Sequence, residues 1–339
     1  MKLLHFLITK ASHNASYIAK GSRWFVACLC AFQMIACDQA EPEPAPDPEP
    51  EILYDPADVA VINRLIDEND LSLHGNKLTK ANPADGTYIP DDWRGFIDWR
   101  WQYDRNLNRI TRLEFLDSVS LKGKVDVSSL NKLWTLYFAG TEVTAIKASN
   151  MDSLKRFIWI GNLVTRDSPD LSGSNSLEFL QLTPGLLSSP LDLSGKERLT
   201  YLNVGGCKLD SLDVSSCKQL ETLVCGANRL TSLNLRGLLK LKSYVCNVQA
   251  VFLTLTGSGS KYSVDIPLES PVFSYPFIQN IDKKISYSEG KLISIDTTVT
   301  AVSFQVETGI DASIPPKYLD QNNRGLSGTL YLTYKDVTR

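Results

Sequence analysis

The chain has 339 residues, with 38 acidic and 35 basic side chains, three histidines and seven cysteines. Its length allows one large domain or a few smaller ones, and its ordinary apolar and charged content excludes global disorder. The formal net charge of −3 argues against a generally basic nucleic-acid binder, so no nucleic-acid partner is expected. Because His5 and His13 lie in a segment expected to be removed, His74 alone would remain for catalytic or metal chemistry.

Residues 1–36 have the features of a secretory signal peptide. Basic residues but no acidic ones precede Asp38, and the apolar run Trp24–Ala36 is too short to cross a bilayer core of ~30 Å. The run ends in Met34-Ile-Ala-Cys37, which resembles the lipobox of bacterial lipoproteins. The resemblance implies cleavage before Cys37 and lipidation of its thiol. An uncleaved anchor helix is the alternative.

Residues 37–51 alternate proline with acidic side chains and are expected to form an extended tether. Such a composition cannot build a core, and its like charges repel one another. Acidic residues directly after the lipidated cysteine also resemble the surface-export signal of Bacteroidetes lipoproteins. This resemblance implies an exported lipoprotein of the outer membrane, anchored by its N-terminal lipid and exposed on the cell surface.

Residues 52–109 are predicted to form an N-terminal cap. Asp55-Pro56 provides a helix N-cap followed by proline at the first helical position, and the apolar spacing predicts a helix over about 56–68. The tryptophan-rich segment that follows leads through a turn into the first repeat, an order that resembles the N-terminal cap of many leucine-rich repeat ectodomains. Cap packing is the preferred interpretation of Trp93, Trp99 and Trp101, and a sugar-binding platform is the alternative.

Residues 110–256 contain a repeat of 21–23 residues. The segments starting at Leu199 and Leu220 align as L-x-x-L-x-(V/C)-x-x-(C/N)-x-L, which is the leucine-rich repeat signature. A second landmark, Asp-(Val/Leu)-Ser, recurs in register at Asp126, Asp170 and Asp192. The coils are expected to begin at Ile110, Leu133, Leu154, Leu177, Leu199, Leu220 and Leu241.

The repeat predicts a solenoid with a parallel sheet on its concave face. The first, fourth and sixth residues of each coil should point inward, and the ninth should turn the chain. A unit this short leaves no room for a long helix, so we expect an extended or 3₁₀ back. The unit resembles the short bacterial class of leucine-rich repeat, including repeats of Bacteroidetes surface lipoproteins.

Four cysteines fall within the repeats and are interpreted as buried structural thiols. Cys225 and Cys246 occupy inward position six of successive coils, and Cys207 occupies the turn position. A Cys225–Cys246 disulfide is the alternative that an exported protein allows. A zinc site is disfavoured, because these cysteines form no C-x-x-C pair and have no histidine nearby, and no metal or cofactor is expected.

Beyond the repeats, residues 257–339 are predicted to form a small all-β domain, a sandwich or barrel. Gly257-Ser-Gly-Ser260 is interpreted as the boundary, and Ser288–Lys291 as a hairpin loop. The expected strands are Tyr262–Pro267, Val272–Pro276, Lys284–Tyr287, Leu292–Ile295, Val299–Val306 and Gly328–Tyr334.

The sequence lacks the common catalytic motifs, so we expect a non-catalytic protein with no catalytic residues. It has no phosphate-binding loop, no H-E-x-x-H and no G-x-S-x-G nucleophile elbow. His74 lies in a turn-like stretch. Paired carboxylates for glycoside hydrolysis need only be close in space and stay open at this point. The repeated aspartates are their obvious source, but repetition at one turn position indicates a structural role.

Positions two, three and five of each coil should project from the concave face, where a ligand would bind. Arg156, Phe179 and Tyr201 share position three of successive coils and should form one stripe. The candidate ligand-binding residues are Trp134, Tyr137, Arg156, Ile158, Phe179, Tyr201 and Asn203. Such side chains are enriched at protein interfaces, although aromatic residues also simply favour strands.

Two functions remain from the sequence. The first is a cell-surface-tethered module that binds a macromolecule, most readily a protein, through its concave face. The second is a glycan-binding surface lipoprotein that serves a nutrient-uptake system, as many Bacteroidetes surface lipoproteins do.

Overall fold

The computed structural model describes residues 53–102, 107–116, 118–161, 165–183, 185–258, 261–265, 277–279, 284–288, 291–294, 297–308 and 325–337. The chain divides into two units, residues 1–49 and 50–339, and the described residues all belong to the second. The expected signal peptide, the lipidation site Cys37 and the tether lie outside the described residues. Within the described ranges, no helix is both long and apolar enough to cross a membrane.

The N-terminal cap begins with the predicted helix, α2 (Pro56–Glu68), which confirms the expected range. Asp55 caps it, because its side chain accepts a hydrogen bond from the Ala57 N–H. Val59, Ile62 and Leu65 on one face are fully buried. Three short strands form an antiparallel sheet: β1 (Ser72–Leu73), β2 (Asn76–Lys77) and β5 (Val119–Ser120). A 3₁₀ helix, η1 (Asp91–Gly95), lies between β2 and β5 in the chain.

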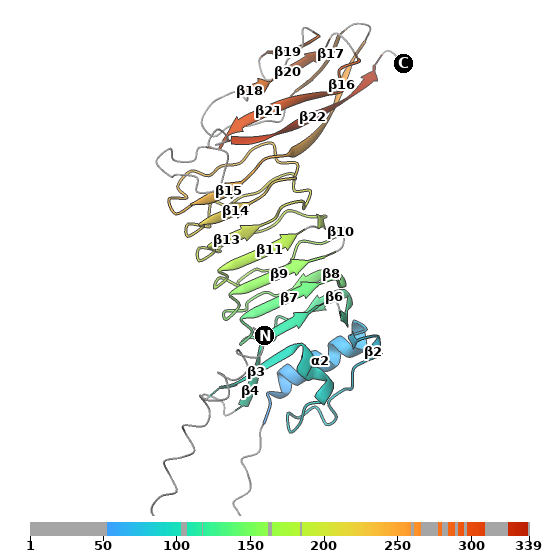
Figure 1. The fold of residues 1–339 in the computed structure, drawn as a ribbon, viewed down its shortest axis with the longest axis vertical. Coiled ribbons are helices and arrows are strands. Elements are labelled where there is room, and N and C mark those ends of the chain that lie inside the picture. Colours follow the sequence, from blue (N-terminus) through green and yellow to red (C-terminus); the bar gives the residue numbers. More distant parts are fainter. Residues whose placement is uncertain are drawn as a thin grey trace, which may run out of the picture. The chain divides into compact units, whose positions relative to one another are not determined.

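The repeats stack their strands in one eight-stranded sheet, the repeat sheet, seven strands of which are parallel (Figure 1). At one edge β3 (Ile97–Gln102) pairs antiparallel with β4, so the cap covers that edge. From β4 onward the strands run in chain order: β4 (Leu107–Phe115), β7 (Thr135–Ala139), β9 (Arg156–Ile160), β11 (Phe179–Thr183), β13 (Tyr201–Asn203), β14 (Thr222–Val224) and β15 (Ser243–Val245).

The strand register confirms the coil assignment made from the sequence. Partners across the sheet are Arg112, Thr135, Arg156, Phe179, Tyr201, Thr222 and Ser243, each at position three of its coil. The intervals between these residues, 21 to 23 residues, repeat the predicted spacing coil by coil. Seven parallel strands correspond to six full turns, so the described residues between 110 and 245 form a β-solenoid with the spacing of the predicted repeat.

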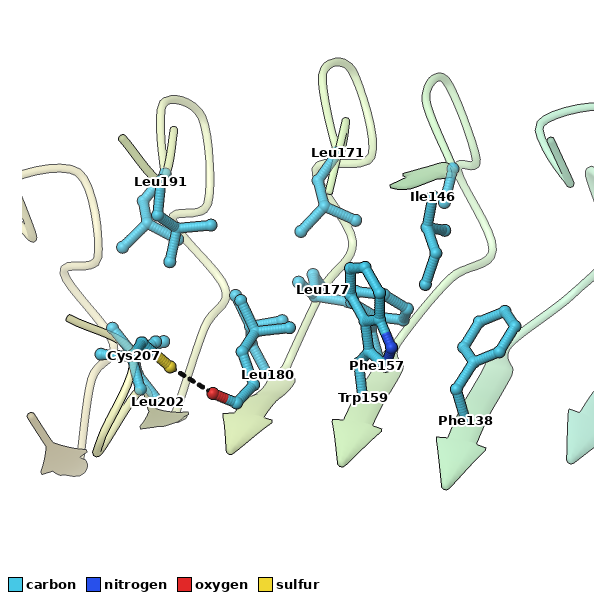
Figure 2. Packing of buried hydrophobic residues seen from close by; sticks show 14 of the residues in the cluster. Phe138, Ile146, Phe157, Trp159, Leu171, Leu177, Leu180, Leu191, Leu202 and Cys207 are labelled. Atoms are coloured by element: carbon cyan, nitrogen blue, oxygen red, sulfur yellow. Dashed lines mark hydrogen bonds between the residues drawn. The ribbon is translucent and has the colours of Figure 1, made fainter. Parts of the chain in front are cut away.

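The interior of the solenoid is an apolar core in which side chains of the strands meet side chains of the back, such as Ile146, Leu171 and Leu191 (Figure 2). Positions one, four and six are buried in every coil, as the pattern predicted. Position six becomes smaller along the stack, from Phe138 and Trp159 through Leu182 and Val204 to Cys225. Each residue packs against its counterparts in the neighbouring coils, which makes the core continuous.

The back of the solenoid is extended where it is described. Short parallel pairs join neighbouring coils there: β6 (Lys122–Asp126) with β8 (Glu142–Lys147), and β10 (Thr165–Arg166) with β12 (Leu186–Leu187). Among the described repeat residues the 3₁₀ part of the expectation was wrong, since turns rather than 3₁₀ helices connect these strands to the next repeat.

The repeated polar residues make turns. The Asp126, Asp170, Asp192 and Asp213 carboxylates each accept the N–H of the serine two residues later. Hydrogen bonds from that serine, first from its hydroxyl for Asp170 and Asp192 and first from its N–H for Asp213, lower the pKa of these three carboxyls. At the ninth position, Asn228 accepts from Cys207 N–H and Leu209 N–H and donates to Val204 O. Both landmarks are therefore structural, as expected.

All four repeat cysteines are buried and unbridged. Cys225 Sγ and Cys246 Sγ lie 3.1 Å apart in adjacent coils. The Cys207 thiol donates to the Leu182 carbonyl (Figure 2). The interpretation as structural thiols is confirmed for this structure.

The C-terminal strands form one seven-stranded sheet among the described residues rather than the expected sandwich or barrel. Gly257 pairs with Tyr262, so the glycine-serine segment is a hairpin inside this sheet, which already begins at Gln249. The Ser288–Lys291 hairpin is present. That residues 257–339 form a separate domain stays a prediction, and the expected strand Val272–Pro276 lies outside the described residues. The strands are β16 (Gln249–Ser258), β17 (Lys261–Asp265), β18 (Phe277–Gln279), β19 (Ile285–Ser288), β20 (Lys291–Ser294), β21 (Ala301–Glu307) and β22 (Gly325–Asp336).

Candidate binding surface on the repeat sheet

Positions two, three and five of the coils lie on the side of the repeat sheet opposite the core. We call this surface, from β7 to β15, the sheet face. Alternation along each strand explains positions three and five, because position four between them is buried. Position two directly precedes each strand and is exposed or half-buried. All seven residues predicted for ligand binding lie here: Arg156 and Trp134 are exposed, whereas Tyr137, Ile158, Phe179, Tyr201 and Asn203 are half-buried.

The predicted stripe at position three is a stack of planar groups. The rings of Phe179 and Tyr201 are parallel within 1°, with centroids 4.3 Å apart. The Arg156 guanidinium, which comes from the strand on the other side of Phe179, lies over the Phe179 ring with its Cζ 4.4 Å from the ring centroid. Strand spacing of ~4.8 Å is close to the spacing of stacked rings, so the register makes the three side chains neighbours and their rotamers complete the stack. The structure thus joins three predicted residues in one assembly.

Position five forms a second row beside the stack. Tyr137, Ile158, Gln181 and Asn203 are partners across adjacent strands. Two amides in this row bond to their own chain: Gln181 Nε2 donates to Thr183 Oγ1, and Asn203 Oδ1 accepts from the Gly205 N–H. Further along, Val224 and Val245 make the row apolar.

Position two carries charged side chains that pair with one another. Lys155 Nζ lies 2.9 Å from Glu178 Oε1, and Lys242 Nζ lies 2.7 Å from Glu221 Oε2. Both pairs are about half exposed, so each stabilises the fold little. Their consequence is that position two contributes almost no net charge. Arg156 differs from these lysines. No carboxylate of the described residues lies within ion-pair distance of its guanidinium.

The other residues considered for chemistry are placed as follows. His74 is exposed in the turn between β1 and β2. Trp93 is fully buried and its Nε1 donates to Thr79 O, which supports cap packing for this residue. The side chains of Trp99 and Trp101 lie outside the described ones. No cluster of three or more metal-ligating side chains occurs within the described part of the chain.

Two buried arginines were missed by the sequence analysis. Arg109, 2% exposed, makes two 2.9 Å hydrogen bonds to the fully buried Asp58 and joins α2 to the first coil. Arg166 lies over Trp159, with Cζ 4.2 Å from its ring, and burial lowers the pKa of its guanidinium. The Arg166 guanidinium occupies the space beside Gly185. Gly185 stands at the ninth position of its coil, where the other coils have a side chain, and this absence could have indicated that another group fills the space.

The chain is similar to known proteins in structure only. No protein-family description and no curated protein sequence match the chain. Among solved structures, the functional domain of InlJ from Listeria monocytogenes, described as including a cysteine ladder, is similar with 16% identity and a TM-score of 0.37. The match covers 68% of this chain and 56% of that one. Likeness at this level carries no argument about function, so the repeat assignment rests on this chain's own register and burial.

Proposed function

We propose that the chain is a non-catalytic binding protein that holds a protein partner on its sheet face. The observation that carries this proposal is that partly exposed aromatic side chains gather on one face: Trp134 and Tyr137 at β7, Phe179 on β11 and Tyr201 on β13. Aromatic residues with a neighbouring arginine are enriched where proteins bind one another. A leucine-rich repeat fold is also suited to protein interaction.

Rigidity of the surface supports this function. The strands that carry the residues are hydrogen-bonded to neighbours on both sides, and the stack of Arg156, Phe179 and Tyr201 restrains three side chains before any ligand arrives. Binding to ordered groups avoids much of the entropic cost of immobilising side chains, ~0.5–1.5 kcal/mol for each flexible one.

The protein is proposed to work at the cell surface, anchored in the outer membrane by a lipid on Cys37. The support is the sequence resemblance around Met34–Cys37 and the acidic, proline-rich segment that follows. Replacing Cys37→Ser should move the protein from the detergent phase to the aqueous phase in a detergent phase partition. Equal partitioning of the variant and the wild type would contradict lipidation at this residue.

Glycan binding is the second candidate. The amides of Gln181 and Asn203 beside the aromatic stack favour it, since amides bind sugar hydroxyls and ring faces pack on sugars. Both amides, however, already bond to their own chain. A protein partner is therefore the better supported proposal.

The test is to probe a protein array and a glycan array with the purified full chain. The double variant Trp134→Ala, Tyr201→Ala should lose at least about tenfold in affinity for any ligand found, since each buried aromatic contact contributes on the order of 1–2 kcal/mol. The matched control is Phe252→Ala, Tyr331→Ala, which removes an exposed, stacked aromatic pair from the C-terminal sheet. Equal binding by the sheet-face variant, with an unchanged circular dichroism spectrum, would refute the proposal.

A further inference from the structure

We propose that the sheet face takes an extended peptide segment of the partner that presents a carboxylate to Arg156 and an aromatic side chain to Tyr201. This inference rests on the proposed function and specifies its ligand. Three observations carry it: the open end of the stack, the apolar surroundings of that end, and the charge of Arg156.

The stack ends abruptly at Tyr201. Phe179 has the Arg156 guanidinium on one side and the Tyr201 ring on the other, so both of its faces are used. On the next two strands, position three is occupied by Thr222 and Ser243. These side chains are too small to continue the stack, so the second face of Tyr201 borders a shelf floored by Thr222 and Ser243.

The shelf suits an aromatic side chain better than a sugar ring. The position-five row changes here from the amides Gln181 and Asn203 to Val224 and Val245, both half-buried. A sugar carries hydroxyl groups around its edge, and the valines offer them no hydrogen bond. An aromatic ring would stack on Tyr201 and bury its edge against the valines, so it would gain both ring stacking and apolar burial.

Arg156 supplies the charge that selects the partner. Its side chain is exposed, its Cζ lies over the Phe179 ring, and it has no carboxylate partner among the described residues, whereas Lys155 and Lys242 on the same face are paired. A guanidinium held in one plane makes bidentate hydrogen bonds to a carboxylate, which are among the stronger hydrogen bonds in proteins. The expected partner group is therefore an Asp or Glu side chain.

The distance between the two contacts defines the ligand further. Arg156 on β9 and Thr222 on β14 are three strands apart, so the two contacts are ~14 Å apart at ~4.8 Å per strand. In an extended peptide, residues four apart point to the same side and lie ~13 Å apart. A peptide that crosses the strands should thus carry an acidic residue and an aromatic residue four positions apart.

The experiment uses a displayed library of random peptides, selected on the immobilised full chain. Enriched peptides should share the acidic and aromatic pair at this separation. For the best peptide, made synthetically and measured by fluorescence anisotropy, Arg156→Gln should weaken binding at least about tenfold. Thr222→Tyr should do the same, because the new ring continues the stack and fills the shelf. Lys155→Gln, the adjacent exposed residue on the same face, should change the affinity less than about twofold.

The outcomes separate this inference from the proposed function. Enrichment of peptides without an acidic residue, failure to enrich any peptide, or unchanged binding by Arg156→Gln would overturn the inference. If an array ligand binds through the sheet face and Arg156→Gln binds it as well as the wild type does, the proposed function stands and the inference is wrong. Melting temperatures of Arg156→Gln and Thr222→Tyr close to that of the wild type exclude misfolding as the cause of a loss.

Discussion

The buried ion pair between the cap and the first coil makes the strongest prediction about stability. Asp58→Ala removes a fully buried carboxylate that bonds Arg109 Nε and Nη2 at 2.9 Å and accepts the Ile110 N–H at 2.8 Å. Breaking one side of a buried pair costs ~3–5 kcal/mol, and a lost acceptor for a buried N–H adds ~1–3 kcal/mol. Asp55, with Oδ2 3.2 Å from Arg109 Nε, retains part of the attraction. We expect a loss of about 4 kcal/mol in the free energy of unfolding.

Hydrogen exchange is the appropriate assay, because repeat proteins can unfold in parts and a global transition would average the effect. Protection should fall most in α2 and in β4, which Asp58 and Arg109 connect. Asp67→Ala is the matched control on the same helix. Its pair with Lys80 is about half exposed, so its loss should cost less than about 1 kcal/mol.

A double variant separates the ion pair from packing. Asp58→Leu with Arg109→Met removes both charges of the pair, so no arginine faces a missing carboxylate, although the Ile110 N–H loses its acceptor as it does in Asp58→Ala and Asp55 loses its contact with Arg109. The double variant should therefore be more stable than Asp58→Ala. If Asp58→Ala lowers protection no more than Asp67→Ala does, the argument that this buried pair holds the cap on the solenoid is refuted.

Three further predictions concern the repeats. Val248 is 67% exposed and has a φ of +60°, a conformation in which a β-branched residue is strained. Val248→Gly should therefore raise the free energy of unfolding by about 0.5–1 kcal/mol. Gly185→Ala should cost about 1–3 kcal/mol, because its Cβ would lie 2.0 Å from the Nη2 of the buried Arg166. Burial raises the pKa of Cys207 and Cys217 to about 11 from 9.0, so the stability that these two thiols contribute should be fully present below pH 9 and should be lost as the pH rises from 9 to about 11, because the unfolded thiols ionise first.

Each of these has a control. Val248→Ile keeps the strain and should show no increase in melting temperature, and a gain equal to that of the glycine variant would argue against strain as the cause. Gly95→Ala, whose Cβ would meet nothing closer than 3.8 Å, should have a small effect by urea unfolding. The alkaline loss should shrink in Cys207→Ala, Cys217→Ala, and an identical pH profile would contradict the thiol explanation.

The stripe on the sheet face shows how far periodicity can predict a site. Placing Arg156, Phe179 and Tyr201 in one column needed only the coil spacing, since in-register parallel strands put equal positions side by side. Their stacking and the opening beside Thr222 required coordinates, because a column fixes neighbours but not the rotamers that decide which faces are covered.

The cap and the C-terminal sheet were predicted less completely. The start of α2 followed from Asp55 and Pro56, which act within one turn of the chain. Asp58 lies in the first turn of α2, but its carboxylate pairs with Arg109, 51 residues away, and nothing local in the sequence indicates that partner. Likewise, Gly257 carries the local mark of a linker, but pairing with Tyr262 makes it part of a strand.

The sequence by itself determined the solenoid, because each coil contacts mainly its neighbours and a repeated pattern therefore specifies the register, the core and the outward columns. Tertiary structure alone decided which polar groups are buried together, as with Arg109 and Asp58 or Arg166 beside Gly185, and which charges on the sheet face are already paired. Such contacts depend on the distance between two side chains and on their orientation, and the spacing of a repeat specifies neither.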